Sequence, residues 1–190
     1  MAILPIVTYD DPVLTTKAEP VTENSEELQQ LIRDMFETMY NAEGVGLAAP
    51  QIGRSIRLFV MDADPFTDDD EKQGNYGPKT IINPEITWQS NDITEHEEGC
   101  LSLPEVRENI KRPEKITLTF LDENFEENKL TVDRMLARVI QHELDHLDGI
   151  LFIDHLGSFR KRLLKSKLRQ IAEGKIQASY PLRTPASTSS

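Results

Sequence analysis

The sequence predicts an α+β fold from two helical patterns and one strand pattern. Residues 28–40 carry apolar side chains at i, i+3, i+4 and i+7, the spacing of an amphipathic helix. Met135, Leu136, Val139 and Ile140 repeat that spacing ahead of His142. Residues 115–132 alternate as a hairpin of two short strands. We therefore expect short, mostly antiparallel sheets around a central helix that carries His142. An N-terminal amphipathic helix and a C-terminal basic helix at 158–174 should lie outside them.

The first fifty residues contain an extended segment, a helix and a glycine-rich loop. Residues 3–22 are apolar and interrupted by prolines, which favours extended chain on the surface of the core. Asn24 and Glu27 form a possible capping box for the first helix, and Gly44 should end it. Residues 44–53 (GVGLAAPQIG) are typical of a loop that a ligand or backbone approaches closely. No Lys-Ser/Thr pair follows the glycines, so this is not a phosphate loop.

The remaining elements are expected to form one domain. Strands are predicted at 56–61, at 79–89 with a break at Pro84, and at 93–103, before the hairpin. Residues 62–77 are acidic and rich in turn formers, so they should form a surface loop. Residues 1–174 are long enough for a single core. Residues 175–190 should be a flexible tail, since the last ten are rich in Pro, Ser and Thr.

Composition and charge exclude several classes of protein. The chain is 38% hydrophobic and 28% charged, with no run of ~20 apolar residues that could span a membrane. Its first residues do not resemble a secretion signal, and Cys100 is its single cysteine, so a cytoplasmic location is expected. The net charge of −12 argues against DNA binding. Residues 157–190 nevertheless contain eight Lys or Arg and one acidic residue, which predicts either an anionic partner or a solvated helix face.

The segment 141–146 (QHELDH) predicts a metal site. His142 and His146 are four residues apart, so on a helix their Cβ atoms lie about 5–6 Å apart on one face. Glu143 would lie beside the metal, where a carboxylate can take a proton from a metal-bound water. Thr131 or Asp133 could cap this helix, and a glycine at 149 could end it.

The motif alone leaves the third ligand open. Cys100 is one candidate, although a lone cysteine is more often an inert buried residue. His155, with acidic residues at 148 and 154 nearby, would instead make an ordinary HExxH zinc endopeptidase. A closed structural metal site would need a fourth ligand, for which His96 is the candidate. Residues four apart on a strand are separated by about 13 Å, which argues against His96 and Cys100 sharing one ion.

Three stretches taken together resemble a known family. GVGLAAPQ at 44–51, EGCLS at 98–102 and QHELDHLDG at 141–149 occur in the order of the signature motifs of the peptide deformylases, bacterial type. The resemblance extends over most of residues 3–170. It implies a metal-dependent hydrolase that removes the N-formyl group from the N-terminal formyl-methionine of newly synthesised polypeptides and releases formate.

The resemblance also implies roles for individual residues. It makes Cys100, His142 and His146 the three metal ligands and Glu143 the general base and acid. A metal-bound hydroxide would attack the formyl carbon, and Glu143 would pass the proton to the leaving amine. The oxyanion would be stabilised by the side-chain amide of Gln51 and by the backbone N–H at position 101, Leu101. Fe(II) is the native ion that the family favours, and Zn(II), Ni(II) or Co(II) would also suit these ligands.

The substrate peptide is expected to lie extended along Val45, Gly46 and Gly99, as an added strand. Its methionine side chain would enter an apolar pocket beside Val139 and Met135.

Three charged residues are expected near this pocket. Arg107 matches a family position close to the substrate backbone, and Glu43 is a candidate partner for it. Arg138 shares the helix face of His142. It could place its guanidinium at the pocket mouth or pair with an acid.

By the same resemblance, the basic C-terminal helix would dock on the ribosome. The residues expected to contact phosphates are Arg160, Lys161, Lys165 and Arg169.

Overall fold

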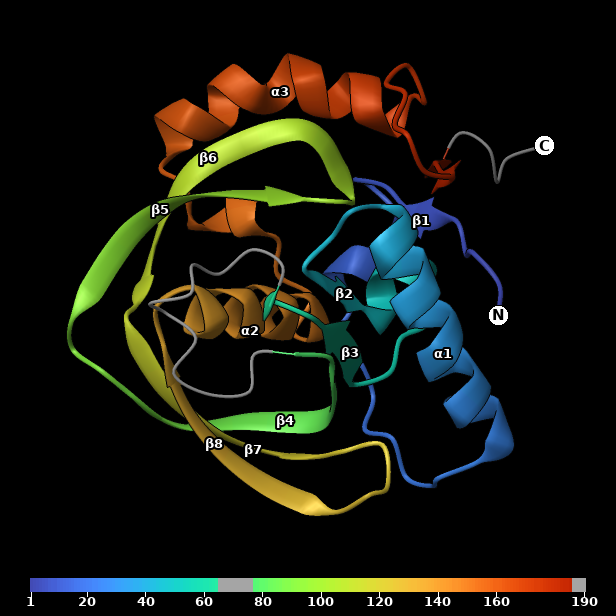
Figure 1. Cartoon of the computed structure of the whole chain (residues 1–190). Coiled ribbons are helices and arrows are strands. Elements are labelled where there is room, and N and C mark those ends of the chain that lie inside the picture. Colours follow the sequence, from blue (N-terminus) through green and yellow to red (C-terminus); the bar gives the residue numbers. More distant parts are fainter. Residues whose placement is uncertain (65–76, 186–190) are drawn as a thin grey trace.

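The structure is a computed structural model that describes residues 1–64 and 77–185 (Figure 1). Most of the predicted acidic loop and the last five residues therefore lie outside the described residues. The described helices are α1 (Glu26–Asn41), α2 (Arg134–Leu147) and α3 (Ser158–Ala172). The strands are β1 (Ile6–Val7), β2 (Gly46–Ala48), β3 (Leu58–Met61), β4 (Lys79–Gln89), β5 (Ile93–Cys100), β6 (Leu103–Pro113), β7 (Lys115–Leu121), β8 (Glu127–Asp133) and β9 (Leu182–Arg183). The predicted α+β class is confirmed.

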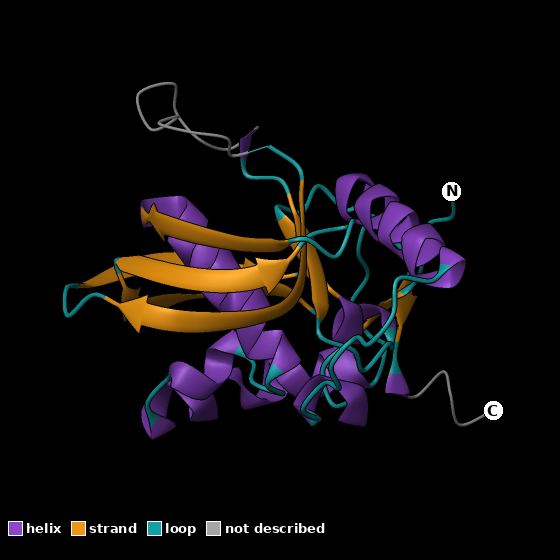
Figure 2. Cartoon of the chain, turned by 90° about the horizontal axis from the view of Figure 1, so that it is seen from below, coloured by secondary structure: helices purple, strands orange, loops and turns teal. Residues whose placement is uncertain are grey.

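The strands form one main sheet and two smaller pairs. The main sheet is antiparallel, with the order β2-β3-β4-β7-β8, and β5 and β6 form a separate antiparallel ribbon. Strand β1 pairs in parallel with β9. Helix α2 runs between the main sheet and the ribbon, and α3 packs on the outer side of β6 (Figures 1 and 2). The helix that carries the histidines is thus enclosed by strands.

Alternation along β3 explains why both faces of the main sheet are covered at this end. Phe59 and Met61 belong to the core cluster that contains the apolar face of α2. Leu58 and Val60 point the other way, into the cluster that contains the apolar stripe of α1. All four side chains are fully buried, so α2 covers one face of the sheet at β3 and α1 covers the other.

The N-cap of the first helix lies one residue later than predicted. Ser25 is the N-cap, and its side chain accepts a hydrogen bond from the N–H of Leu28 at 3.1 Å. Asn24 instead accepts a hydrogen bond from the side chain of Gln29. Ser and Asn are nearly equivalent as caps, so their order could not be decided from residue type.

The segment predicted as one strand at 93–103 is the first half of a hairpin. Strand β5 ends at Cys100, the chain reverses at residues 101–102, and β6 returns along it. The alternation of β6 was hidden because charged Glu108 and Arg112 occupy two of its inward positions, beside Val106 and Ile110. The reversal places Cys100 at the tip of the ribbon.

The C-terminal segment also differs from the prediction of a flexible tail for 175–190. Ile6 N–H donates to Pro181 O at 2.9 Å, and Thr8 N–H donates to Arg183 O at 3.1 Å. These bonds attach β9 to β1, at the other end of the chain. A partner so distant in sequence leaves no local signal around residue 182.

Candidate functional site

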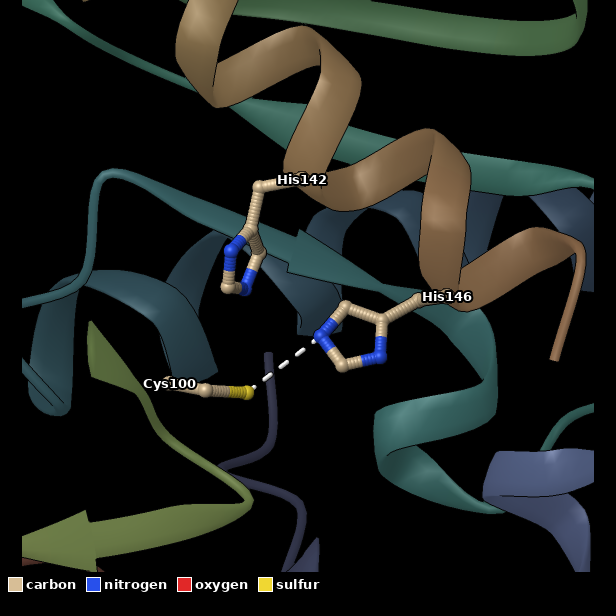
Figure 3. Close-up of side chains that lie close together, drawn as sticks. All are labelled: Cys100, His142 and His146. Carbon is tan, nitrogen blue, oxygen red and sulfur yellow. Dashed lines mark hydrogen bonds between the residues drawn. The ribbon is translucent and has the colours of Figure 1, made fainter. Parts of the chain in front are cut away.

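Cys100 from β5 meets His142 and His146 from α2 in one cluster (Figure 3). Their ligand atoms all lie within 4.8 Å of one another. Cys100 Sγ is 3.3 Å from His146 Nε2, and the two imidazole centroids are 5.1 Å apart. Helical spacing puts both rings on one face of α2, and the end of β5 brings the thiol to that face.

The donor set of this cluster fits a divalent transition metal. One thiolate and two imidazoles suit Fe(II), Zn(II), Ni(II) or Co(II), and three protein ligands leave a position open, as in catalytic sites. Glu143 Oε2 is buried beside the cluster without a hydrogen-bond partner among the described residues. A buried carboxylate oxygen in that state fits a site completed by a metal and its water.

The other proposed ligands are engaged elsewhere. His155 Nε2 lies 2.8 Å from Asp145 Oδ2, and Asp148 pairs with Arg57 at 2.9 Å. Asp154 accepts a hydrogen bond from the N–H of residue 151. His96 is exposed on β5 and belongs to no metal-ligand group of the described residues. The geometry therefore favours Cys100 as the third ligand.

Mutual electrostatic interactions in the cluster favour the thiolate. Burial opposes ionisation of Cys100, but the neighbouring charges of His146 and His142 outweigh it and lower its pKa to about 5. Burial likewise opposes the charged form of His142. The Cys100 thiolate and Glu98 overcome it and hold the pKa of His142 well above its ordinary value. The surroundings of Cys100 therefore favour the negatively charged thiolate next to positive charge.

Glu98 is a functional residue that the sequence analysis missed. Its Oε1 lies 3.4 Å from His142 Nδ1, and both its oxygens accept hydrogen bonds from Arg112 Nε at 2.9 and 3.1 Å. Burial raises the pKa of Glu98, but His142 and Arg112 lower it more, so the carboxylate stays charged. A carboxylate on the far nitrogen of a metal-binding histidine fixes its ring and tautomer. Glu98 precedes Cys100 by two residues, and side chains two apart on a strand share a face. That spacing was the sequence signal that could have placed Glu98 near the metal ligands.

Glu143 lies directly against the glycine-rich segment. A Cβ atom at Gly46 would come within 2.5 Å of Glu143 Oε1, so only glycine fits beneath this carboxylate. Burial raises the pKa of Glu143, although His142 and His146 oppose that shift. A raised carboxylate pKa suits a group that takes and returns a proton near neutral pH.

Gln51 presents its amide N–H groups to the cluster. Its Oε1 accepts a hydrogen bond from the N–H of Ala48 at 2.8 Å, which fixes the orientation of the amide. Its Nε2 then lies 3.4 Å from Cys100 Sγ and 3.3 Å from Ser102 Oγ. Leu101 follows Cys100 in the reversal between β5 and β6 and lines the same cavity as Gln51. Both proposed oxyanion donors thus lie beside the cluster of Cys100, His142 and His146.

A cavity of about 600 Å³ opens onto this cluster and brings the predicted substrate residues together. Its lining includes all five of them: Val45, Gly46, Gly99, Arg107 and Val139. Glu143, Gln51, Cys100 and His142 line it too, together with a stretch that the sequence analysis did not anticipate, residues 177–180.

Arg107 takes another partner than expected, and Arg138 takes several. Arg107 Nε donates to Glu97 Oε1 at 2.7 Å rather than pairing with Glu43. Arg138 is buried and donates to the backbone carbonyls of Ile110 at 2.9 Å and Thr94 at 3.0 Å. Its Nη1 also lies 3.7 Å from Glu98 Oε2, so Arg138 has the acidic partner that was one of its two expected environments. Arg138 lines the cavity and ties α2 to the β5–β6 ribbon.

Comparison with known proteins decides the family. The family model for polypeptide deformylase matches residues 3–162. This chain belongs to the peptide deformylase family. Among its deformylase relatives, the one from Salinibacter ruber is 53% identical over 96% of this chain and 95% of its own length. The one from Christiangramia forsetii is 48% identical, over 96% of each.

Solved deformylase structures share the fold. The enzyme from Legionella pneumophila is 40% identical and covers 92% of this chain and 98% of its own, with a TM-score of 0.81. A deformylase from Ehrlichia chaffeensis in complex with actinonin is 35% identical over 93% of this chain and 100% of its own, with a TM-score of 0.82. Within the described part of this deformylase-family chain, none of the helices combines the length and apolar character of a membrane span.

Proposed function

We propose that this chain removes the N-formyl group from the N-terminal formyl-methionine of nascent polypeptides and releases formate. The observation that carries the proposal is the convergence of the Cys100, His142 and His146 ligand atoms with Glu143 in one cavity, in a chain of the peptide deformylase family.

The side chains present can perform each part of this hydrolysis. Cys100, His142 and His146 would hold a divalent ion, which supplies Lewis acidity and makes water a stronger acid. Glu143 takes the proton of the attacking water as the C–O bond forms. It returns the proton to the amine nitrogen as the C–N bond breaks, so formate and a free N-terminus leave.

Two donors would stabilise the oxyanion that develops at the formyl group. Gln51 Nε2 is oriented toward the cluster by the hydrogen bond that Ala48 donates to Oε1. The backbone N–H of Leu101 lies at the tip of the β5–β6 ribbon, next to Cys100. Loss of one oxyanion donor typically lowers the rate by ~10²–10³.

The cavity suits an extended peptide with an apolar first side chain. Val45 and Gly46 offer a strand edge on one side, and Gly99 offers another. Val139 is buried and Met135 half-exposed on the α2 face that lines the cavity, so a methionine side chain would pack between them and the cluster. Arg107 would contact the substrate backbone.

We further propose Fe(II) as the native ion, with Zn(II), Ni(II) or Co(II) as substitutes. A thiolate ligand beside ferrous iron is readily oxidised, so activity should fall in air unless Ni(II) or Zn(II) replaces the iron. Metal analysis of protein purified without oxygen would identify the ion.

We propose a cytoplasmic enzyme, folded as one domain that includes residues 1–174 and the paired segment after them, whose helix α3 docks on the ribosome. Arg160 makes a two-fold ion pair with buried Glu108, which leaves Lys161, Lys165 and Arg169 as exposed charges. Phosphate contacts would make ribosome binding weaken steeply with salt. Binding that is independent of salt would contradict this role for α3.

The deciding experiment is formate release from a short N-formyl-Met peptide by anaerobically purified protein reloaded with Fe(II) or Ni(II). Formate with intact peptide bonds supports the proposal, whereas internal cleavage without formate would indicate an endopeptidase. The variant Glu143→Gln should retain one metal per chain and lose activity by about 10²–10⁴-fold. Full activity in that variant would refute the role of Glu143.

A further inference from the structure

The C-terminal segment contributes one wall of the substrate cavity. After α3 the chain turns at Gly174, which has a left-handed φ of 70°, and runs back toward β1. Four consecutive residues of this return line the cavity: Gln177, Ala178, Ser179 and Tyr180. None of the three signature motifs lies in this segment, so nothing in the family resemblance assigns it a role.

Tyr180 makes a specific contact with the catalytic machinery. Its hydroxyl donates a hydrogen bond to the backbone carbonyl of Leu101 at 2.9 Å. Leu101 is also the residue whose N–H we propose as an oxyanion donor. Burial and the negative charge of Cys100 raise the pKa of Tyr180 to about 12, so the phenol remains a donor throughout the physiological range.

The β5–β6 ladder ends at the pair of Cys100 with Leu103, so Leu101 and Ser102 lie in the reversal outside the ladder and their carbonyls take other partners. The register of the ribbon shifts between Gly99 and Cys100. The next carbonyl, that of Ser102, accepts a hydrogen bond from the N–H of Tyr9 at 3.0 Å, just after β1. The same β1 segment holds Pro181 through the N–H of Ile6. Two consecutive carbonyls of the reversal are therefore held by the paired terminal segments.

We propose that Tyr180 is a positioning residue that holds the Leu101 carbonyl and thereby directs the Leu101 N–H toward the developing oxyanion. This inference rests on the proposed function. The hydrogen bond fixes the peptide group that follows Leu101 Cα, and φ and ψ of Leu101 link this group to the preceding one, which carries the N–H. A donor held in this way costs no reorganisation when charge develops. Tyr180 itself need not touch the substrate.

The test compares Tyr180→Phe with wild-type protein in the formate assay. Phenylalanine keeps the ring packing and removes only the donor, so we expect kcat to fall roughly five- to tenfold, the size of one net hydrogen bond, with KM within about twofold. Tyr40→Phe is the matched control. It also loses a hydroxyl hydrogen bond, to Asp62 at 2.7 Å, and Tyr40 does not line the cavity. Its kcat should match that of wild type.

A second readout is independent of activity and of the metal. The Leu101 carbonyl and the Ser102 N–H belong to one peptide group, so the amide ¹⁵N shift of Ser102 in metal-free protein reports the hydrogen bond. It should change in Tyr180→Phe and not in Tyr40→Phe.

Three outcomes would overturn the inference: an unchanged Ser102 shift, an unchanged kcat, or a rise in KM alone, which would indicate substrate contact. Absence of formate from wild-type protein would be a failure of the proposed function instead, and the two failures are distinguishable.

Discussion

Two sides of the substrate cavity are built in different ways. On the α2 side, His142, Glu143 and His146 are placed by the period of one buried helix. On the C-terminal side, Tyr180 is placed by the pairing of β9 with β1, which joins the two ends of the chain. The first arrangement is encoded within a few residues, and the second exists only in the complete fold. The α2 part of the chemistry depends on local spacing, whereas Cys100 and this wall of the cavity are brought in by contacts distant in sequence.

The largest effect is expected from Gly46→Ala, which attacks the α2 side. The new methyl group would meet the Glu143 side chain at 2.5–2.9 Å, so this carboxylate must move. Displacing a catalytic group by about 1 Å costs ~10²-fold in rate, whereas overpacking at one site costs about 1–3 kcal/mol of stability. Formate release should therefore fall about 10²-fold in protein that still folds and binds metal.

Gly157→Ala is the matched control for that change, because an added Cβ there meets nothing within 4 Å. Its activity should equal that of wild type. Wild-type activity in Gly46→Ala would show that Glu143 has room to work from another position.

A smaller effect is expected from Glu98→Gln, which keeps the shape of the side chain and removes its charge. His142 Nδ1 would lose the negatively charged acceptor that fixes its ring, so metal affinity should fall about 10- to 100-fold. Competition with a chelator measures this dissociation constant. Glu108→Gln is the control, since Glu108 is another buried carboxylate on the same ribbon, paired with Arg160. Both variants should lose stability, and equal metal affinities in the two would contradict the role of Glu98.

The smallest effect is expected from Arg183→Met on the C-terminal side. Its guanidinium lies 3.6 Å from the Asp11 carboxylate, and the Arg183 side chain is 37% exposed. The ion pair should therefore contribute less than about 1 kcal/mol to the free energy of unfolding. The backbone hydrogen bonds between β1 and β9 remain, so activity should change less than twofold. A loss as large as that of Tyr180→Phe would mean that side chains rather than backbone pairing hold this wall.

The same contrast explains what could be predicted from sequence. The amphipathic stripe of α1, the hairpin β7–β8 and the helix with His142 and His146 have regular periods, and each was found. Strand β6 was missed because Glu108 and Arg112 point inward, where alternation predicts apolar residues. Both are buried as ion pairs, with Arg160 and Glu98 respectively, which only the folded chain reveals.

The site divides along similar lines. Cys100 and Gln51 were carried over from motif resemblance and Val139 from its helix face, and the structure gathers them in one cavity with the other predicted substrate residues. For Arg138 an acidic partner was one of two expectations, and Glu98 is that partner at 3.7 Å. Its hydrogen bonds to backbone carbonyls of β5 and β6 could not be predicted, because backbone acceptors leave no trace in residue type. Tyr180 was missed because its function depends on a strand pair between residues 6 and 182.

The parallel pairing of β1 with β9 has a consequence for biosynthesis. A chain emerges from the ribosome N-terminus first, so Ile6 and Val7 are available long before Leu182 and Arg183. Contacts of such high sequence separation are also the slowest to form once the chain is free. The α2 side can therefore assemble while β1 still lacks its partner, and the cavity gains this wall only after residues 182–183 have been made. The cavity proposed to receive nascent chains would thus itself be completed late in the folding of its own chain.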